Sequence, residues 1–176
     1  EDITLTVEME TGTGKTYTYI KTMYELNKLY GWTKFIIVVP SVAIREGVLK
    51  SFQTMEDHFG DEYGKRMQYF VYNSKQLSKI DAFATDSAMH CMIINTQAFN
   101  SSFDDTANNA TSRIIFDRRD EFGSRRPIDV IAKTNPIMII DEPQSVLGAN
   151  KKNRTRQGLR LFNPLLMLLY SATHRE

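Results

Sequence analysis

A glycine-rich loop between a strand-like and a helix-like segment is the feature that most constrains this chain. The loop runs from Met9 to Thr16 and follows a strand-like stretch from Thr4 to Val7. Because Gly12 and Gly14 have no Cβ, the backbone between them can curl until successive N–H groups point at one anion. The order of strand, loop and helix therefore predicts a phosphate-binding loop.

The side chains of this loop suit a nucleoside triphosphate. The ammonium of Lys15 is expected to reach the outer phosphates, and the hydroxyl of Thr16 to hold Mg²⁺. A helix beginning near Lys15 adds the positive end of its dipole to the same place. Met9 stands where the general pattern has its first glycine, so a glycine- and threonine-rich turn before a surface helix is the alternative. The predicted nucleotide-binding residues are Thr11, Gly12, Thr13, Gly14, Lys15 and Thr16.

Composition narrows the class of protein. The chain has 176 residues, enough for one domain with a substantial core, and 41% of them are hydrophobic. The 22 basic and 21 acidic residues give a net charge of +1, so any nucleic-acid surface must be local. A single Cys91 excludes an intrachain disulfide framework. No apolar run is as long as a membrane span, and the acidic N-terminus differs from a signal peptide, so a cytoplasmic location is expected.

Strand-like and helix-like segments alternate along the chain. This alternation predicts an α/β domain with a mostly parallel sheet flanked by helices. The expected strands cover residues 4–8, 35–39, 67–72, 89–95, 137–140 and 165–170. The expected helices cover residues 15–30 and 128–133, and a further helix follows Ser41 as far as about Glu56.

A polar stretch interrupts this pattern. Asn, Asp, Ser and Arg dominate from Phe103 to Arg126, so a long exposed insertion is expected within residues 101–127. The rest of residues 1–176 is expected to form one domain. Because motifs lie close to both Glu1 and Glu176, the chain is expected to be a fragment of a longer polypeptide.

A second motif supplies the other half of a nucleotide site. Asp141 and Glu142 follow a buried apolar strand, where an acidic group is costly unless it meets a cation. Asp141 is therefore expected to bind Mg²⁺ through water, and Glu142 to act as general base for an attacking water. Pro143 turns the chain, and the amide of Gln144 then faces the site, where it can sense the outermost phosphate. An acidic turn after a core strand is the alternative.

Hydroxyl residues recur where strands are expected to end. Thr11, Ser41, Thr96 and Ser171 occupy these places, and ligands of parallel α/β sheets bind outside the carboxyl ends of the strands. These positions are therefore expected to line one edge that holds a nucleotide and a polymer. Ser171, Thr173 and His174 follow the last apolar strand and are suited to connect the segment of Glu142 to an adjoining groove.

Three motifs in this order resemble those of a known family. Residues 9–16, 141–144 and 171–173 are similar to the motifs in the first RecA-like domain of superfamily 2 helicases and translocases, which are P-loop NTPases. With residues 39–47 and 170–174, the chain most resembles the Res subunit of type III restriction-modification enzymes. The resemblance covers nearly the whole chain.

The resemblance implies a role for each matching residue. The cofactors would be ATP and Mg²⁺, with Lys15, Glu142 and Gln144 catalytic and Thr16 and Asp141 at the metal. Coupling of hydrolysis to movement would fall to Ser171, Thr173 and His174. The DNA backbone would be contacted by Pro40, Ser41, Arg45 and Thr96. For Arg45 a solvated helix charge, and for Ser41 a plain helix cap, remain the alternatives.

The resemblance also implies partners beyond this chain. They are double-stranded DNA, a modification (methyltransferase) subunit and a second RecA-like domain that supplies an arginine finger. Nothing in the chain resembles the family's nuclease site. Without an arginine finger, hydrolysis is expected to be slower by roughly 10³ to 10⁵. Two alternatives stay open at this point, namely the first domain of another DNA or RNA helicase and a nucleotide-dependent regulatory module.

Overall fold

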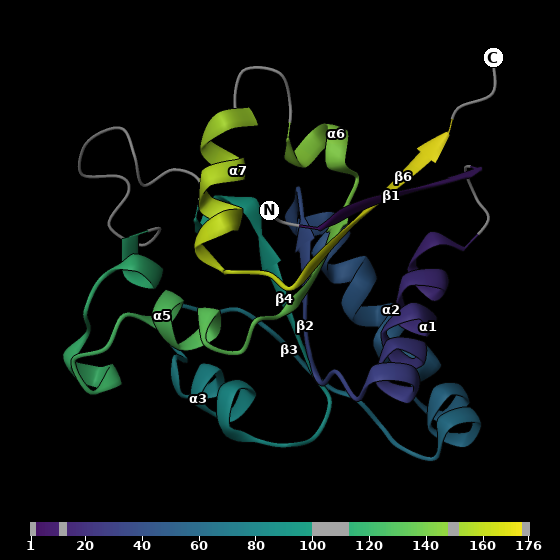
Figure 1. The fold of residues 1–176 in the computed structure, drawn as a ribbon, viewed down its shortest axis with the longest axis horizontal. Coiled ribbons are helices and arrows are strands. Elements are labelled where there is room, and N and C mark those ends of the chain that lie inside the picture. Colours follow the sequence, from purple (N-terminus) through teal and green to yellow (C-terminus); the bar gives the residue numbers. More distant parts are fainter. Residues whose placement is uncertain (1–2, 11–13, 100–112, 148–151, 174–176) are drawn as a thin grey trace.

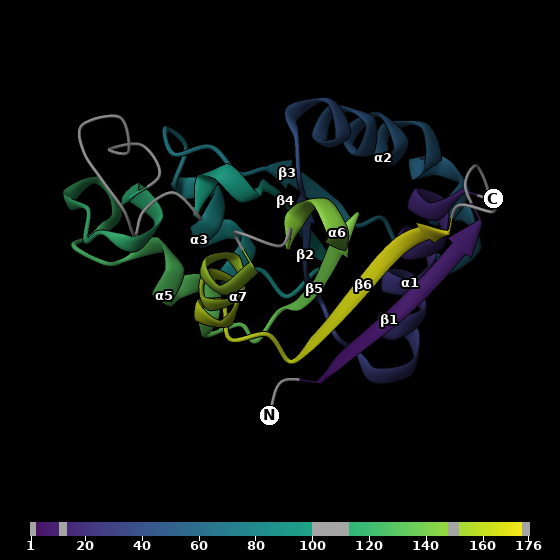
Figure 2. The ribbon, with the colours of Figure 1, turned by 90° about the horizontal axis from the view of Figure 1, so that it is seen from above.

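One parallel sheet organises the molecule. The computed structural model describes residues 3–10, 14–99, 113–147 and 152–173. Within these ranges six strands pair in the order β1-β6-β5-β2-β4-β3, and every neighbouring pair is parallel. Helices lie on both sides of the sheet (Figure 1, Figure 2). The predicted α/β fold, with a parallel sheet flanked by helices, is therefore confirmed.

All six expected strands are present, with ends shifted by a few residues. They are β1 (Thr4–Glu10), β2 (Lys34–Val39), β3 (Gln68–Val71), β4 (His90–Asn95), β5 (Ile137–Asp141) and β6 (Leu166–Thr173). The helices are α1 (Lys15–Tyr30), α2 (Val42–Tyr63), α3 (Ser78–Thr85), α5 (Pro127–Ala132), α6 (Pro143–Val146) and α7 (Lys152–Leu161). Short 3₁₀ turns are η1 (Thr96–Ala98), η3 (Ile114–Phe116) and η4 (Asp120–Phe122). The sequence patterns did not predict α3, α6 or α7.

The sheet separates two apolar cores, because successive side chains of a strand point to opposite faces. In β2, Phe35, Ile37 and Val39 pack on the side of α1 and α2. Ile36 and Val38 pack on the other side, with residues of α3, α5 and α7. Burial on both faces explains why this strand and β4 are apolar at nearly every position.

The two helices nearest the glycine-rich loop are set by their ends. Helix α1 has the predicted bounds and ends at Gly31, whose N–H donates to Asn27 O at 2.8 Å with φ of 73°. Helix α2 begins after Ser41, whose Oγ accepts from Ile44 N at 3.2 Å, as predicted. It continues to Tyr63, seven residues beyond the predicted end at Glu56. Its last turns persist because Phe59 and Tyr63 stack on the ring of Tyr24.

Residues 113–126 are not wholly exposed. Ile115 and Phe122, in the turns η3 and η4, are 0% and 2% exposed and belong to the core beneath α3 and α5. The expectation of an exposed insertion is wrong for these two side chains, because each is an apolar residue within the polar stretch that packs into the core. Residues 100–112, which hold the rest of the expected insertion, lie outside the described ranges.

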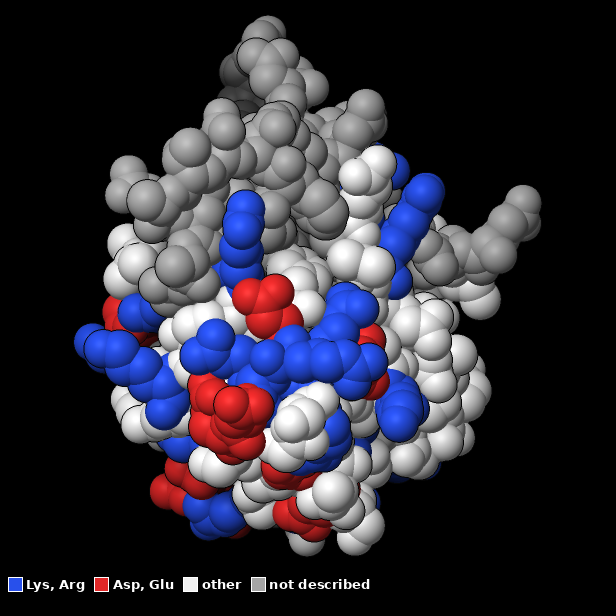
Figure 3. Space-filling view, turned by 90° about the vertical axis from the view of Figure 1, so that its left-hand side faces the viewer, with Lys and Arg blue, Asp and Glu red and all other residues white. Residues whose placement is uncertain are grey.

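The surface around this segment carries both signs of charge. Figure 3 shows a band of Lys and Arg side chains on the end of the molecule formed by α3, α5 and residues 113–126, with acidic side chains beside it. Arg125 pairs with Asp81 and Arg119 with Glu121, each at 2.8 Å. These pairs reduce the positive field of the band. None of the helices in the described ranges is long and apolar enough to cross a membrane.

Candidate functional site

Strand β1 and helix α1, which flank the glycine-rich loop, meet at the carboxyl ends of the six parallel strands. Strand β1 leads into the loop, and helix α1 begins at Lys15. Gly14 precedes the helix with φ of 79°, a conformation that glycine adopts without strain, and its carbonyl accepts from Thr18 N at 3.0 Å. The predicted residues Thr11, Gly12 and Thr13 lie outside the described ranges. The described part of the loop therefore delivers Lys15 and Thr16 on the first turn of a helix.

The fold brings the two predicted halves of the nucleotide site together. Lys15 Nζ lies 2.6 Å from Asp141 Oδ1 at the end of β5 and 3.9 Å from Glu142 Oε1. Asp141 is 2% exposed, and a buried carboxylate is tolerated only beside a cation or strong donors. The ion pair thus joins residues separated by most of the chain and supports the pairing expected from the sequence.

Tyr19 completes the surroundings of Asp141, and the sequence patterns did not single it out as a site residue. Its hydroxyl donates to Asp141 Oδ2 at 3.0 Å, so each carboxylate oxygen has a partner. Burial, and the negative charge of Asp141 beside it, hold the pKa of Tyr19 well above its ordinary value, which keeps the hydroxyl a donor. The signal was its spacing, because a residue four positions after Lys15 lies on the same face of a helix.

Glu142 and Gln144 are held differently. Glu142 has φ of 51°, uncommon for a residue with a side chain, and its side chain is partly exposed beside Lys15. Its N–H donates to Tyr170 O at 3.1 Å, and its carbonyl accepts from the first turn of α6. Gln144 lies in α6 and is exposed. Among the described residues no hydrogen bond joins Gln144 to Lys15 or Asp141.

The Ser-Ala-Thr segment is part of strand β6. The prediction that the strand ends at Tyr170 is wrong by three residues, because Ser171 pairs with Glu8 and the ladder with β1 continues to Thr173. Only the backbone of Thr173 is described, and His174 lies outside the described ranges. Tyr170 also holds Glu142 by its carbonyl, so the segment leading to Ser171 is bonded directly to the acidic motif.

The residues predicted to contact DNA follow β2 and β4, which are neighbours in the sheet. The cap at Ser41 is formed, so its hydroxyl already has a structural role. Arg45 is partly exposed and pairs with Glu46 at 3.0 Å. Thr96 is 4% exposed and hydrogen-bonds to Gln97, whose amide donates to Pro40 O at 3.0 Å. Gln97, which the sequence patterns missed, thus connects the ends of the two strands.

A nucleoside triphosphate with Mg²⁺ fits the chemistry of these groups. Lys15 offers an ammonium at a helix N-terminus, where anions are favoured. Asp141 offers the oxygen ligands that Mg²⁺ prefers, and Thr16 lies one residue after Lys15 with its hydroxyl close to Tyr19. These residues therefore carry the ammonium, hydroxyl and carboxylate groups that could hold a triphosphate and a divalent cation.

Comparisons with known proteins identify the family of this chain. The family model described as type III restriction enzyme, res subunit, matches residues 1–176. The chain is 34% identical over 188 residues to the Res subunit of the type III restriction-modification enzyme EcoP15I of Escherichia coli. It is 33% identical to the EcoPI Res subunit of Escherichia phage P1 and 34% identical to the StyLTI Res subunit of Salmonella typhimurium.

These matches cover nearly all of the chain but little of the relatives. They include 97% of this chain for the first two and 95% for the third, and 18% of the length of each relative. The parallel sheet, flanked by helices on both faces, is consistent with a RecA-like domain of this family. From its sequence match and its fold, the chain belongs to the family of Res subunits of type III restriction enzymes.

Proposed function

We propose that this chain is the ATP-binding motor domain of a type III restriction endonuclease Res subunit, which couples ATP hydrolysis to DNA translocation and cleavage. The observation that carries the proposal is the contact of Lys15 with Asp141 and Glu142 at the end of a parallel sheet. A lysine from a phosphate-binding loop and two carboxylates from a strand end are the groups that ATP hydrolysis needs in one place.

Each residue of this site has a distinct task in the proposal. Lys15 would hold the outer phosphates, and Asp141, with Thr16, would hold Mg²⁺, which would neutralise charge on those phosphates. Glu142, whose side chain stays partly exposed, accepts the proton of the attacking water. The side-chain amide of Gln144, in α6, would contact the outermost phosphate. Bound ATP supplies the phosphoanhydride bond whose hydrolysis drives movement.

Strand β6 is suited to transmit a movement of Glu142 to the residues that follow Tyr170. The carbonyl of Tyr170 accepts from Glu142 N, and Ser171 is the next residue. A shift of Glu142 therefore reaches Ser171 through one hydrogen bond and one peptide. We assign the coupling of hydrolysis to movement to Ser171, Thr173 and His174, with Thr173 and His174 included on the sequence motif alone.

DNA is proposed to cross the ends of β2 and β4. The segment of Pro40, Ser41 and Arg45 offers a helix N-terminus and a guanidinium, both of which suit phosphate oxygens. Thr96 stands behind this segment, and the bond from Gln97 to Pro40 holds the two strand ends together. These groups position a backbone and read no sequence, so the recognition sequence would be read elsewhere in the enzyme.

The proposal places the chain within a larger machine. The chain spans 18% of the length of the curated relatives it matches. A second RecA-like domain, a nuclease and a modification subunit would supply the arginine finger, the cleavage and the sequence recognition. Stimulation of the ATPase of the full-length protein by DNA and not by RNA separates this proposal from an RNA helicase.

The nucleotide site is tested by measuring the binding of a non-hydrolysable ATP analogue to wild type and Lys15→Ala. Loss of the ammonium should weaken binding by about 100-fold, because a charged contact to phosphate is lost. Lys21→Ala is the matched control. Lys21 lies on the same helix, but its Nζ is 2.9 Å from Glu62 Oε1 and the pair lies away from the site. Equal affinity of Lys15→Ala and wild type would overturn the nucleotide site.

A further inference from the structure

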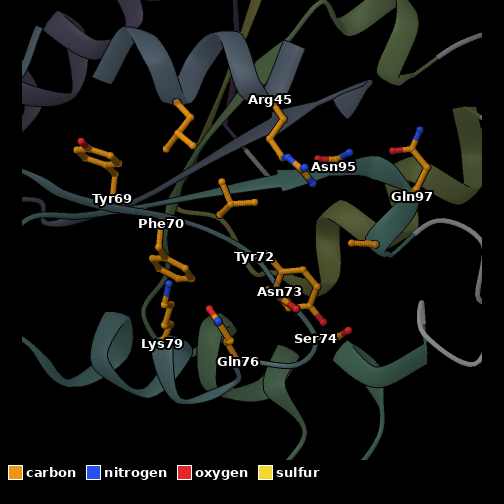
Figure 4. Close-up of a pocket in the computed structure, with 13 residues that line it drawn as sticks. Arg45, Tyr69, Phe70, Tyr72, Asn73, Ser74, Gln76, Lys79, Asn95 and Gln97 are labelled. Atoms are coloured by element: carbon orange, nitrogen blue, oxygen red, sulfur yellow. The ribbon is translucent and has the colours of Figure 1, made fainter. Parts of the chain in front are cut away.

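A groove of about 810 Å³ lies along the opposite edge of the sheet from β1. Its floor is formed by β3 and the residues after it, Tyr69 to Ser74. Helix α2 contributes Arg45 and Leu49 to one side, and α3 with its preceding loop contributes Gln76 and Lys79 to the other. Figure 4 shows Arg45 reaching in from α2 and Lys79 reaching in from α3, with β3 between them. The groove thus follows an edge strand between two helices.

The backbone of this strand is open toward the groove. Gln68 N donates to Met89 O and Tyr72 N donates to Ile93 O, so the backbone groups of these residues face β4. Backbone groups alternate in direction along a strand, and those of Tyr69 and Val71 therefore point away from β4. In the described part of the chain no strand pairs with this outer side of β3. An open edge of this kind accepts an added strand.

Two aromatic residues on the floor of the groove pack against the helices on either side, and several other lining residues are polar. Tyr69 stacks on Phe52 of α2 at 4.8 Å between ring centroids, and Phe70 meets Phe83 of α3 edge-on at 6.1 Å. Side chains of an added strand would alternate between these two sides, as those of β3 do. An extended segment with apolar residues at alternate positions matches this arrangement.

Polar groups gather where β3 ends. The hydroxyl of Tyr72 and the Oδ1 of Asn95 are buried without a hydrogen-bond partner among the described residues. Lys79 has no acidic partner within ion-pair distance in the described ranges, whereas Arg45 is paired with Glu46. Lys79, which is exposed, is therefore free to meet an acidic group on that side of the groove.

We propose that this groove binds an extended segment of a separate protein, which adds to the sheet as a strand beside β3. The segment carries apolar side chains at alternate positions and an acidic residue that meets Lys79. Affinity comes from main-chain hydrogen bonds to Tyr69 and Val71, and specificity from the two sides. With a rise of about 3.3 Å per residue, the four residues of β3 provide an edge of about 13 Å.

Along the length of β3, a peptide explains the groove better than a nucleic acid does, whereas the DNA contact proposed above for Arg45 lies at the carboxyl end of β2, where the groove ends. Single-stranded nucleic acids are held by basic tracks and exposed aromatic platforms. Here Tyr69 stacks on Phe52 and Phe70 meets Phe83 edge-on. The two cations among the lining residues, Arg45 and Lys79, lie on opposite sides of β3 and form no continuous basic track. Open backbone N–H and C=O groups at strand spacing match a peptide, which carries the same groups. The inference is independent of the nucleotide site.

The experiment measures binding of a fluorescent peptide to the full-length polypeptide that carries this chain. In the peptide, valine alternates with threonine around a central aspartate. Val71→Pro removes only an outward N–H, which an edge strand tolerates, and Val71→Ala is the matched control that keeps the amide. We expect saturable binding of the peptide to wild type with a Kd of about 100 µM or tighter. The Kd of Val71→Pro should be about tenfold higher than the Kd of Val71→Ala. Binding of the ATP analogue should be unchanged in both variants.

A second arm needs no protein variant. Two versions of the peptide are made, each N-methylated on every second amide. In one version the methyl groups block the N–H groups on one edge of the extended peptide, and in the other version they block those on the opposite edge. Because an added strand uses one edge for β3, one version should lose binding and the other should keep it. Absence of saturable binding up to about 1 mM, equal effects of the two methylated peptides, or equal affinities of Val71→Pro and Val71→Ala would each overturn the proposal. Displacement of the peptide by oligothymidylate with no effect of either methylation would show a nucleic-acid site instead.

Discussion

The proposed nucleotide site and the proposed binding groove along β3 lie on one parallel sheet, but they satisfy their polar groups in opposite ways. In the nucleotide site, Asp141 binds both Lys15 and Tyr19, so a ligand must exchange contacts within the protein. In the groove, the outer backbone groups of Tyr69 and Val71 face open space, so a ligand gains contacts that the protein lacks. The first region is a closed site, in which a ligand replaces contacts between protein side chains. The second is an open site, in which a ligand adds hydrogen bonds to unpaired backbone groups.

Position in the sheet explains this difference. Strand β5 lies between β6 and β2, and the carboxylate at its end is buried, so its charge must be neutralised by the protein itself. Strand β3 is at the edge, where water can take the outer hydrogen bonds at little cost. The comparison therefore predicts large effects for changes in the closed site and small ones for changes in the open site.

The largest effect is expected for Glu142→Gln. Replacing the proposed general base should lower ATP hydrolysis by the full-length protein by about 100-fold to 10,000-fold, while the affinity for an ATP analogue stays nearly constant. The measurement is steady-state ATPase activity with DNA present. Glu62→Gln, a glutamate of α2 that pairs with Lys21 away from the site, serves as control. A Glu142→Gln enzyme with wild-type turnover would remove Glu142 from the catalytic site.

Lys15→Ala should also destabilise the fold. The change leaves the buried charge of Asp141 without its ammonium, and the free energy of unfolding should fall by about 2 to 3 kcal/mol, measured by urea denaturation. In Lys15→Ala combined with Asp141→Asn, the loss should be smaller than the sum of the single losses, because the uncompensated charge is gone. Additive losses would mean that the two side chains do not stabilise each other.

Tyr19→Phe should have an intermediate effect. It removes a hydrogen bond to a charged group, so the free energy of unfolding should fall by about 1.5 kcal/mol at neutral pH. Because the pKa of Tyr19 is raised in the folded state, its contribution is present below the unfolded pKa of 10.0 and is lost as the pH rises above it. The difference in urea stability between wild type and Tyr19→Phe should therefore shrink above pH 10. A constant difference would contradict the assignment.

The smallest effect is expected for Val71→Pro at the open edge. Its outward N–H has no strand partner, so the free energy of unfolding should change by no more than about 0.5 kcal/mol. Gln68→Pro is the matched contrast, because Gln68 is exposed but its N–H donates to Met89 O, and it should cost about 1 kcal/mol or more. Equal losses in the two variants would show that the outer side of β3 is not open.

Sequence patterns predicted the strands of the sheet better than some of the helices that flank it. Continuous apolar runs identified β2, β4 and β5, because burial on both faces leaves no polar positions. Helix α7 was missed, since its Thr155 and Gly158 do not look like core residues. Gly158 lies so close to Phe99 that a Cβ there would be 2.8 Å from the ring, a packing relation that only the fold reveals.

The same limit applies to the site. Lys15, Asp141 and Glu142 were predictable because their motifs imply chemistry, and the structure brings them together. Tyr19 was not, because a tyrosine at helical spacing is usually a core residue, and its partner is distant in the sequence. The role of Gln97 in joining two strand ends likewise depends on the neighbourhood of β2 and β4.

The contact of Lys15 with Asp141 has a consequence for the order in which ligands arrive. As long as the ammonium holds this carboxylate, Asp141 is a poor ligand for free Mg²⁺, since like charges compete for the same oxygen. If the proposed nucleotide site is correct, the phosphates would draw Lys15 away and leave Asp141 available. The metal is thus expected to enter together with the nucleotide, and free Mg²⁺ at cellular concentration should leave the site unfilled until a triphosphate arrives.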